Sequence, residues 1–157
     1  MPKLKTLSIV PPALYLSAML GEVKQYASVA DSNRDAMLNA LAQAAVLRVQ
    51  EFADTALVAT RLELTAVPDE RGRVKLYEGG GAVESVQTED GSQAVPFSAL
   101  GAEAISVQTR GAVRVVYVTA PDEGEQIRLR PVVYRYATAL YDGLGTDELN
   151  AILNEAL

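Results

Sequence analysis

The longest periodic segment of the chain, residues 33–57, is predicted to form an amphipathic helix. Ser32 is a good N-cap residue, and Asp35 follows in the first turn, where a carboxylate suits the positive end of a helix. Apolar side chains then recur at steps of three and four residues, which is typical of a helix that faces a core. This stripe consists of Leu38, Leu41, Ala45, Val49, Phe52 and Ala56.

A second stripe of mostly small side chains runs along the same helix, offset from the first. It consists of Met37, Ala40, Ala44 and Leu47, whereas the polar face is formed by Asn39, Gln43, Gln50 and Asp54. A core-facing helix needs only one apolar stripe. The second stripe is therefore expected to be either additional core or a contact surface for another subunit.

Shorter helices are predicted on both sides of this segment. Residues 13–27 follow Pro11-Pro12 and carry apolar side chains at helical spacing, with Met19 and Val23 on one face. Residues 125–142 carry a similar pattern, which Gly143 should end. Pro131 lies inside this pattern, so the helix is expected either to begin near Pro131 or to kink there.

The last residues, 144–157, predict a further short amphipathic helix. Its apolar side and its end are candidates for docking on a partner: Leu149, Ile152, Leu153, Ala156 and Leu157. The alternative is an ordinary helix that packs on its own domain.

Between the helices the apolar period changes to two, which indicates β-strands. Strands are expected at 61–67, 73–78, 82–88, 93–97, 104–109 and 113–119, separated by turns such as Glu89-Asp90-Gly91. Residues 104–109 are expected to pair with 113–119 across Arg110-Gly111. The 113–119 strand is apolar on both faces and should be central. The fold class is thus predicted as α+β: N-terminal helices, a small antiparallel sheet with hairpins, and a C-terminal helix.

Length and composition limit the function classes that remain. The 157 residues suit one domain, expected over 13–143, with an N-terminal arm at 1–12 and a C-terminal docking segment at 144–157. The net charge of −6 argues against binding nucleic acid with the whole surface. No segment reaches the roughly 20 apolar residues of a membrane span, and Pro11-Pro12 interrupts an N-terminal run that loosely resembles a signal peptide.

The sequence offers little chemistry. It contains no histidine and no cysteine, which excludes thiolate metal sites, disulfides and imidazole acid–base catalysis. The acidic cluster Asp122, Glu123 and Glu125 could hold a hard cation, but an acidic helix N-terminus is the favoured interpretation. Gly79-Gly80-Gly81 lacks the Lys-Ser/Thr of a phosphate loop and is expected to be a hinge or a sharp turn. We expect no catalytic set, no metal and no cofactor, and hence no enzyme.

One local basic group remains, Arg128, Arg130 and Arg135. Arginines at this spacing most often form the solvated face of a helix. The alternatives are contact with a partner or with DNA phosphates.

Three segments in this order resemble the head–tail connector (adaptor) proteins of tailed bacteriophages. SNRDAMLNALAQAAVLRVQEFADTAL is similar to the opening helix of that family. AVESVQTEDGSQAVPFSAL is similar to its hairpin, and VRVVYVTAPDEGEQIRLRPVVYRYATALYDG is similar to its ending, a strand that leads into a helix closing on Leu-Tyr-acid. The resemblance covers roughly residues 14–143. The chain departs from the pattern at two places. Pro131 falls where the last helix of the family usually runs through, and Val118-Thr119 follows the aromatic residue of the final strand, where the family often has glycine.

The resemblance implies a structural virion protein rather than an enzyme. It implies a homo-oligomeric ring of about twelve copies that docks beneath the portal and extends the DNA exit channel. The partners would be the portal, a downstream neck or tail protein and double-stranded DNA without sequence specificity, first in the host cytoplasm and then in the virion neck. Two alternatives are another ring-forming neck protein, such as a stopper or tail terminator, and a cellular α+β binding module.

Overall fold

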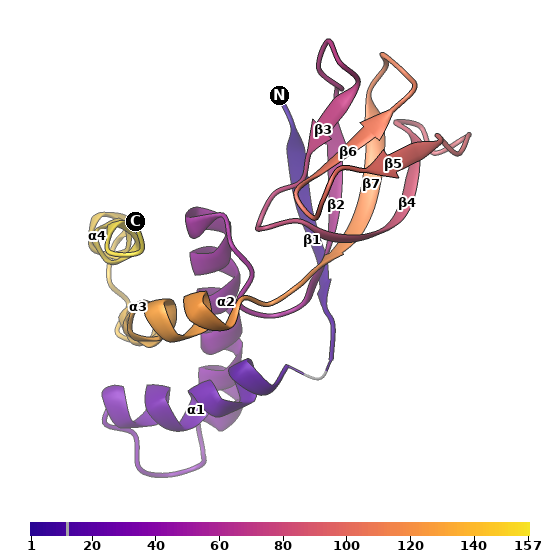
Figure 1. Cartoon of the computed structure of the whole chain (residues 1–157). Coiled ribbons are helices and arrows are strands. Elements are labelled where there is room, and N and C mark those ends of the chain that lie inside the picture. The colour runs from indigo at the N-terminus through magenta and orange to yellow at the C-terminus, as the bar shows by residue number, and fades with distance from the viewer. Residues whose placement is uncertain (12) are drawn as a thin grey trace. The chain divides into compact units, whose positions relative to one another are not determined.

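The computed structural model describes residues 1–11 and 13–157, and they divide into two compact units (Figure 1). The β unit comprises residues 1–11 and 59–120, and the helical unit comprises residues 12–58 and 121–157. The α+β class is confirmed. The expected division differs, because residues Lys3–Ile9 do not form an arm but pair as a strand with residues 60–65.

The helical unit contains four helices: α1 Leu14–Tyr26, α2 Asp35–Ala53, α3 Glu123–Tyr141 and α4 Thr146–Asn154. Helix α3 contacts each of the other three. Helix α2 begins later than predicted, because its N-cap position is Arg34 and not Ser32. The helix ends where Asp54 adopts a left-handed conformation at φ +52°.

The predicted core stripe of α2 is largely correct. Leu38, Ala45 and Val49 are fully buried. The prediction for Gln50 is wrong, because this side chain is buried and not on the polar face. Its Oε1 accepts hydrogen bonds from the backbone N–H groups of Leu57 and Val58, so it holds the chain that leaves α2.

Helix α3 is continuous from Glu123 to Tyr141 and contains Pro131, so it does not begin at this proline. Its start is fixed by Asp122, whose carboxylate accepts a hydrogen bond from the Glu125 N–H. Gly143 ends it as predicted, in a left-handed conformation at φ +70°. The start predicted for α1 after Pro11-Pro12 is only partly described, because Pro12 lies outside the described residues.

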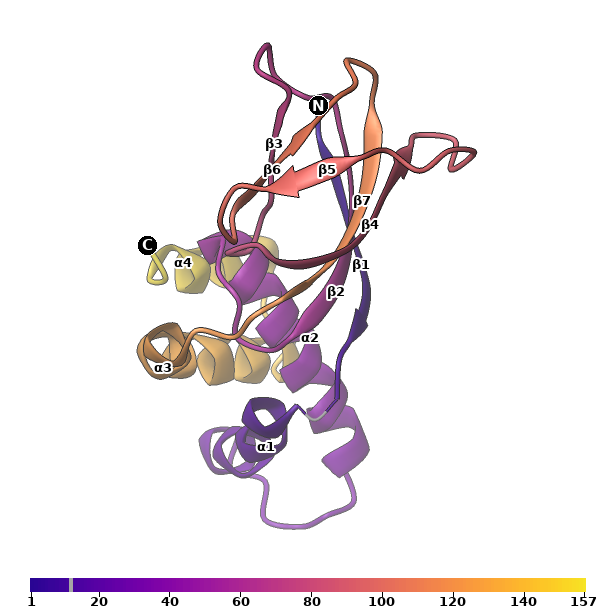
Figure 2. The same ribbon diagram turned by 45° about the vertical axis from the view of Figure 1, so that its right-hand side comes forward.

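The β unit contains two sheets (Figure 2). The four-stranded antiparallel sheet has the order β1-β2-β7-β4, and the three-stranded sheet has the order β3-β6-β5. Their strands are β1 Lys3–Ile9, β2 Thr60–Ala66, β3 Arg73–Lys75, β4 Gly81–Thr88, β5 Phe97–Ala99, β6 Ala104–Val107 and β7 Val113–Thr119. The central position predicted for residues 113–119 is confirmed.

The pairing predicted between residues 104–109 and 113–119 is wrong. Both edges of β7 are occupied, one by β2 and the other by β4. Strand β6 therefore joins β3 and β5 in the second sheet. Side chains of the two sheets form one core, which includes Leu62, Leu64, Val74, Ile105, Val115 and Tyr117.

The glycine run is a site of close packing and not only a turn. Gly80 has φ +70°, and a Cβ there would lie 1.9 Å from the Ala102 carbonyl oxygen. A Cβ on Gly81 would lie 1.9 Å from the carbonyl oxygen of Val118 on β7. Only glycine allows the chain to enter β4 at this distance from its neighbours.

Candidate functional site

The second stripe of α2 forms an exposed surface on the helical unit. Met37 is 46% exposed, Ala40 and Ala44 are exposed, and Leu47 is half-buried. No charged residue occurs in α2 between Ala36 and Leu47. The stripe is therefore not additional core of a single copy, which was the first of the two possibilities drawn from the sequence. We call Met37, Ala40, Ala44 and Leu47 the α2 stripe.

The C-terminal docking candidates separate into two groups. Leu153 and Ala156 are buried in the helical unit, at 0% and 2% exposure, so they are not available to a partner. Leu149 and Ile152 are half-buried, and Leu157 is 84% exposed. Helix α4 thus packs on its own unit through Leu153, as expected if residues 144–157 form an ordinary helix of the domain.

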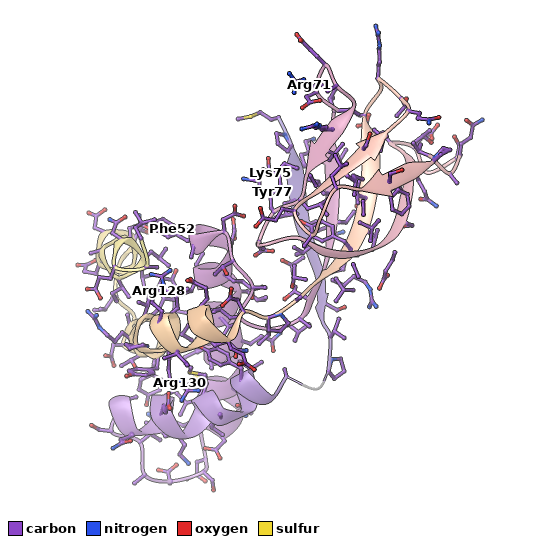
Figure 3. The ribbon with its side chains drawn as sticks, viewed as in Figure 1. Phe52, Arg71, Lys75, Tyr77, Arg128 and Arg130 are labelled. Atoms are coloured by element: carbon purple, nitrogen blue, oxygen red, sulfur yellow. The ribbon has the colours of Figure 1, made fainter. Side chains whose placement is uncertain are left out.

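The three arginines of α3 all form ion pairs within the helical unit, and two of them, Arg128 and Arg130, are labelled in Figure 3. The Arg128 guanidinium lies 2.7 Å from the Glu125 carboxylate, and it also donates to the Ala156 carbonyl. Arg130 pairs with Glu22 of α1 at 3.2 Å, and Arg135 pairs with Glu155. These contacts tie α1 and the end of the chain to α3, so the three charges are already compensated.

Arg130 also lies over the Tyr15 ring, with its guanidinium carbon 5.7 Å from the ring centre. The Tyr15 hydroxyl donates to the Gln126 carbonyl at 3.2 Å. Burial raises the pKa of Tyr15 to about 12, although the Arg130 charge acts in the opposite direction. This cluster fixes α1 against α3 and has the character of a structural contact.

The acidic turn before α3 acts as a helix start. Asp122 caps α3 and Glu125 binds Arg128, and this ion pair raises the pKa of the arginine. Within residues 1–11 and 13–157, no group of three or more His, Cys, Asp or Glu side chains is placed to hold a metal ion. None of the helices that the structure describes is long and apolar enough to cross a membrane.

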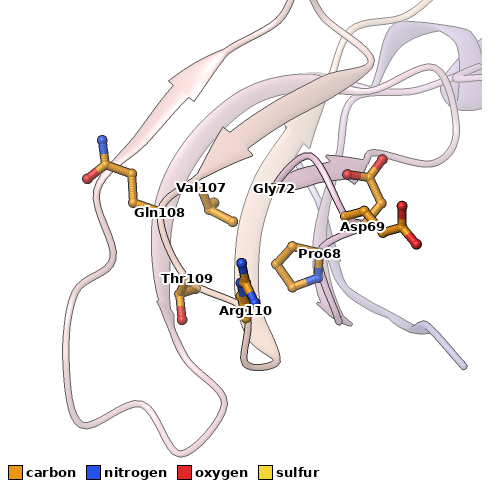
Figure 4. Close-up of a pocket in the computed structure, with 8 residues that line it drawn as sticks. Pro68, Asp69, Gly72, Val107, Gln108, Thr109 and Arg110 are labelled. Carbon is orange, nitrogen blue, oxygen red and sulfur yellow. The ribbon is translucent and has the colours of Figure 1, made fainter.

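A hollow of about 490 Å³ lies at the loop end of the β unit (Figure 4). Its walls are the β2–β3 turn and the β6–β7 turn: Pro68, Asp69, Glu70, Gly72, Val107, Gln108, Thr109 and Arg110. The Asp69 carboxylate accepts from the backbone N–H groups of Arg71 and Arg73, which lowers its pKa. Because these bonds use the carboxylate to shape the turn, the hollow holds no evident catalytic group.

Sequence analysis missed a row of basic side chains on the second sheet. Arg71, Arg73 and Lys75 are exposed and recur at every second residue, with the half-buried Tyr77 two residues further on. Figure 3 shows Arg71, Lys75 and Tyr77. The Lys75 Nζ lies 4.8 Å from the centre of the Tyr77 ring. Within the part of the chain that the structure describes, the Arg71 and Arg73 guanidinium groups form no ion pair. The signal was the alternation Arg-Gly-Arg-Val-Lys: it places Arg73 and Lys75 on one face of β3, whereas Arg71 lies in the turn before this strand.

Charge is distributed unequally between the units. The β unit contains eight Lys or Arg and eight Asp or Glu residues, whereas the helical unit contains six and twelve. The net charge of −6 therefore resides in the helical unit, and the β unit is neutral. Sequence analysis treated the charge as a property of the whole chain.

Comparisons with known proteins rest on structure alone. No protein-family model matches the sequence, and no curated protein matches it significantly. A chain in the neck of the empty gene transfer agent (GTA) particle, computed with C6 symmetry, matches with a TM-score of 0.62 and 14% identity, over 98% of this chain and 94% of that chain.

Two further structures agree. A chain in the neck of the native GTA particle, computed with C12 symmetry, has a TM-score of 0.57 and 15% identity, over 98% of this chain and 94% of that one. A chain in the virion of the native GTA particle has a TM-score of 0.60 and 14% identity, over 96% and 93%. The protein is therefore similar in fold, over nearly its whole length, to a chain found in the neck of GTA particles.

Proposed function

We propose that this protein is a ring-forming structural component of the neck of a tailed, phage-like particle. Within that neck it acts as a head–tail connector that docks beneath the portal, extends the DNA exit channel and offers the surface to which the tail attaches. It is located in the virion neck, after assembly in the host cytoplasm.

The observation that carries this proposal is the likeness to the GTA neck chain over nearly the full length of both chains. A match that includes both the helical unit and the β unit depends on the order of all the elements, and not on one common substructure. The connector resemblance of three sequence segments supports the same assignment independently. Fold alone does not determine function. A subunit of a ring must also have a surface through which it contacts the next subunit.

The α2 stripe supplies such a surface. It is apolar, uncharged and exposed in a single copy, and a ring requires a surface that each subunit repeats around the axis. About twelve copies agree with the C12 symmetry computed for the neck of the native GTA particle. The neck of the empty GTA particle was computed with C6 symmetry, so six copies are the other ring size to test. The second candidate function is another ring-forming neck protein, such as a stopper or tail terminator.

A structural role also agrees with the chemistry of the chain. The sequence has no histidine or cysteine, and the hollow between the β2–β3 and β6–β7 turns uses its aspartate to shape a turn. A neutral or acidic channel wall would let DNA slide past without being held, because phosphate binding requires clustered cations.

The test is the mass of the purified protein, measured by light scattering alone and after mixing with the portal protein encoded in the same genome. A discrete ring, or a stoichiometric complex with the portal, supports the neck function, and its mass separates about twelve copies from six. A chain that stays monomeric and ignores the portal at high concentration would overturn the proposal in favour of a cellular binding module.

Docking on the portal is proposed for the exposed end of the chain. Deleting residues 144–157 would be a poor test, because it would also remove the buried Leu153 and Ala156 and uncover α3. Leu157→Glu changes only an exposed side chain and should weaken portal binding without unfolding the protein. Asn150→Glu, at an exposed position of α4, is the matched control.

A further inference from the structure

We infer that the ring closes by packing the α2 stripe of one copy against a row of apolar side chains on α3 of the next copy. This row, called here the α3 row, consists of Ile127, Pro131 and Tyr134. The inference rests on the proposed function and names the two surfaces that would meet.

The α3 row lies on the outer face of its helix. The three residues are spaced at i, i+4 and i+7, which places them on one side of an α-helix. Ile127 is 75% exposed, Pro131 is exposed and Tyr134 is half-buried. The buried residues of α3, such as Leu129, Val133 and Ala137, lie on the opposite side.

The two surfaces face away from each other within one copy. Helices α2 and α3 are in contact, and each turns its buried face to the interior of the helical unit. The α2 stripe and the α3 row both lie away from the buried faces of their helices, so they are two different surfaces of the unit. A rotation that brings one surface onto the other can be repeated from copy to copy, which is the requirement for a heterologous interface in a closed ring.

The surfaces are complementary in size. Ala40 and Ala44 leave a shallow strip along α2, whereas Ile127 and Tyr134 are large side chains that project from α3. Large side chains of one helix packing between small ones of another is the ordinary geometry of close helix contacts. Pro131 adds an acceptor, since its missing N–H leaves the Ile127 carbonyl without its usual helical donor. The exposed Gln43 amide beside the α2 stripe is a donor of the right kind.

Charge selects a second copy as the occupant. Two helical units that each carry −6 repel one another unless they meet through uncharged faces. The α2 stripe contains no charge, and the arginines that flank the α3 row are compensated by Glu125, Glu22 and Glu155 of their own unit. The α2 stripe is therefore neutral, and the exposed Glu123, one turn before Ile127 on the same face of α3, is the charge that borders the α3 row.

Charge substitutions test the pairing, with ring mass measured by light scattering in the presence of the portal protein. Ala44→Glu and Ile127→Lys should each lower the ring fraction about tenfold or more, because each buries an unpaired charge in the interface. The double variant A44E/I127K should recover most of the ring, since every interface then contains one charge of each sign. Both positions are exposed, so the melting temperature of each variant should match the wild type.

The control is Val67→Lys, which places a charge at a 67% exposed apolar position of the β unit. It should leave the ring unchanged. Rings that form normally in both single variants, or single variants that fail while the double variant fails equally, overturn the inference and leave the proposed function standing. A wild type that stays monomeric and does not bind the portal overturns both.

Cysteine cross-linking supplies a second measurement, because the chain has no cysteine of its own. Under mild oxidation, A44C/I127C should produce a ladder of covalent oligomers up to the ring size on a non-reducing gel. Neither single variant should cross-link. Dimers from A44C alone would mean that α2 meets α2 across a twofold axis, which contradicts the inference.

Discussion

Buried polar groups show how single residues specify this fold. Gln50 lies in the core of the helical unit at 0% exposure, and its side chain satisfies two backbone N–H groups where the chain leaves α2. Tyr117 has the equivalent role in the β unit, where its hydroxyl both donates to and accepts from the backbone of Tyr77. Both side chains connect a regular element to a segment that has no ladder partner there.

Replacing Gln50 by leucine should therefore destabilise the helical unit. The buried N–H groups of Leu57 and Val58 would lose the Gln50 Oε1 acceptor, and leaving a buried N–H group unsatisfied costs about 1–3 kcal/mol. Chemical denaturation should show this loss of unfolding free energy. Gln43→Leu, in the same helix but exposed, should change stability by less than about 0.5 kcal/mol. Equal effects at the two positions would contradict a structural role for the Gln50 amide.

The stability of the turn that follows β4 should depend on pH through a single residue, Asp90. Asp90 accepts hydrogen bonds from the Thr88 hydroxyl, the Ser92 hydroxyl and the Ser92 N–H, which lower its pKa to about 2 from 3.8. The folded state therefore takes up this proton less readily than the unfolded state. Its contribution to stability is present above pH 4 and is lost as the pH falls from about 4 to about 2.

Melting temperatures of the wild type and Asp90→Asn should thus differ at pH 7 and converge near pH 2. Glu89→Gln, which removes the neighbouring exposed charge, should not reproduce this pattern. A difference that persists unchanged down to pH 2 would show that the carboxylate charge is not what holds the turn.

At the scale of elements, helix α3 organises the helical unit. It contacts α1, α2 and α4, and its arginines pair with Glu22 of α1 and with Glu155 after α4. It does so although Pro131 interrupts its hydrogen bonding. The packed face of the helix, with Leu129 and Val133, is sufficient to keep it continuous.

Pro131→Ala should stabilise the helical unit, because it restores a backbone N–H on an exposed face where no side-chain contact is lost to the core. The gain should be up to about 3 kcal/mol, measured by denaturation. Gly21→Ala in α1, where a Cβ has no neighbour within 4 Å, is the comparison and should gain about 1 kcal/mol from helix propensity alone. A loss of stability in Pro131→Ala would mean that α3 depends on the proline geometry.

At the scale of the whole molecule, the unequal distribution of charge bears on contact with DNA. The arginines of α3 are occupied, whereas Arg71, Arg73 and Lys75 form an exposed row on a neutral unit. If passing DNA contacts this protein, the exposed cations Arg71, Arg73 and Lys75 are the side chains that can approach its phosphates.

Replacing Arg71, Arg73 and Lys75 together by glutamine should abolish most of a weak, salt-dependent association with duplex DNA at low ionic strength. The slope of log K against log salt should decrease by about 0.9 for each phosphate contact removed. Arg61→Gln is the control, because Arg61 is in the same unit but is paired with Glu84 at 3.0 Å. An unchanged slope in the triple variant would assign DNA contact to another surface, or to none.

Local pattern predicted much of this protein. The apolar stripe of α2, the turn at Asp90, the helix end at Gly143 and the central place of residues 113–119 follow from periodicity and from residue conformations, which act over a few neighbours. The second stripe of α2 was also visible in the sequence, but the pattern left open whether it was additional core or a contact surface, and only the structure shows that it is exposed.

Tertiary structure decided what depends on long-range partners. Residues 104–107 could not be assigned to the second sheet from their own pattern, since the edges of β7 were taken by strands far away in the sequence. The burial of Gln50 and Leu153, and the compensation of the α3 arginines, depend on which helices pack together. The sequence by itself thus determined the α+β class and most of the elements, with the exception of strand β1, which was expected to be an arm. Packing alone decided which surfaces were left free, because exposure is a property of contacts and not of composition.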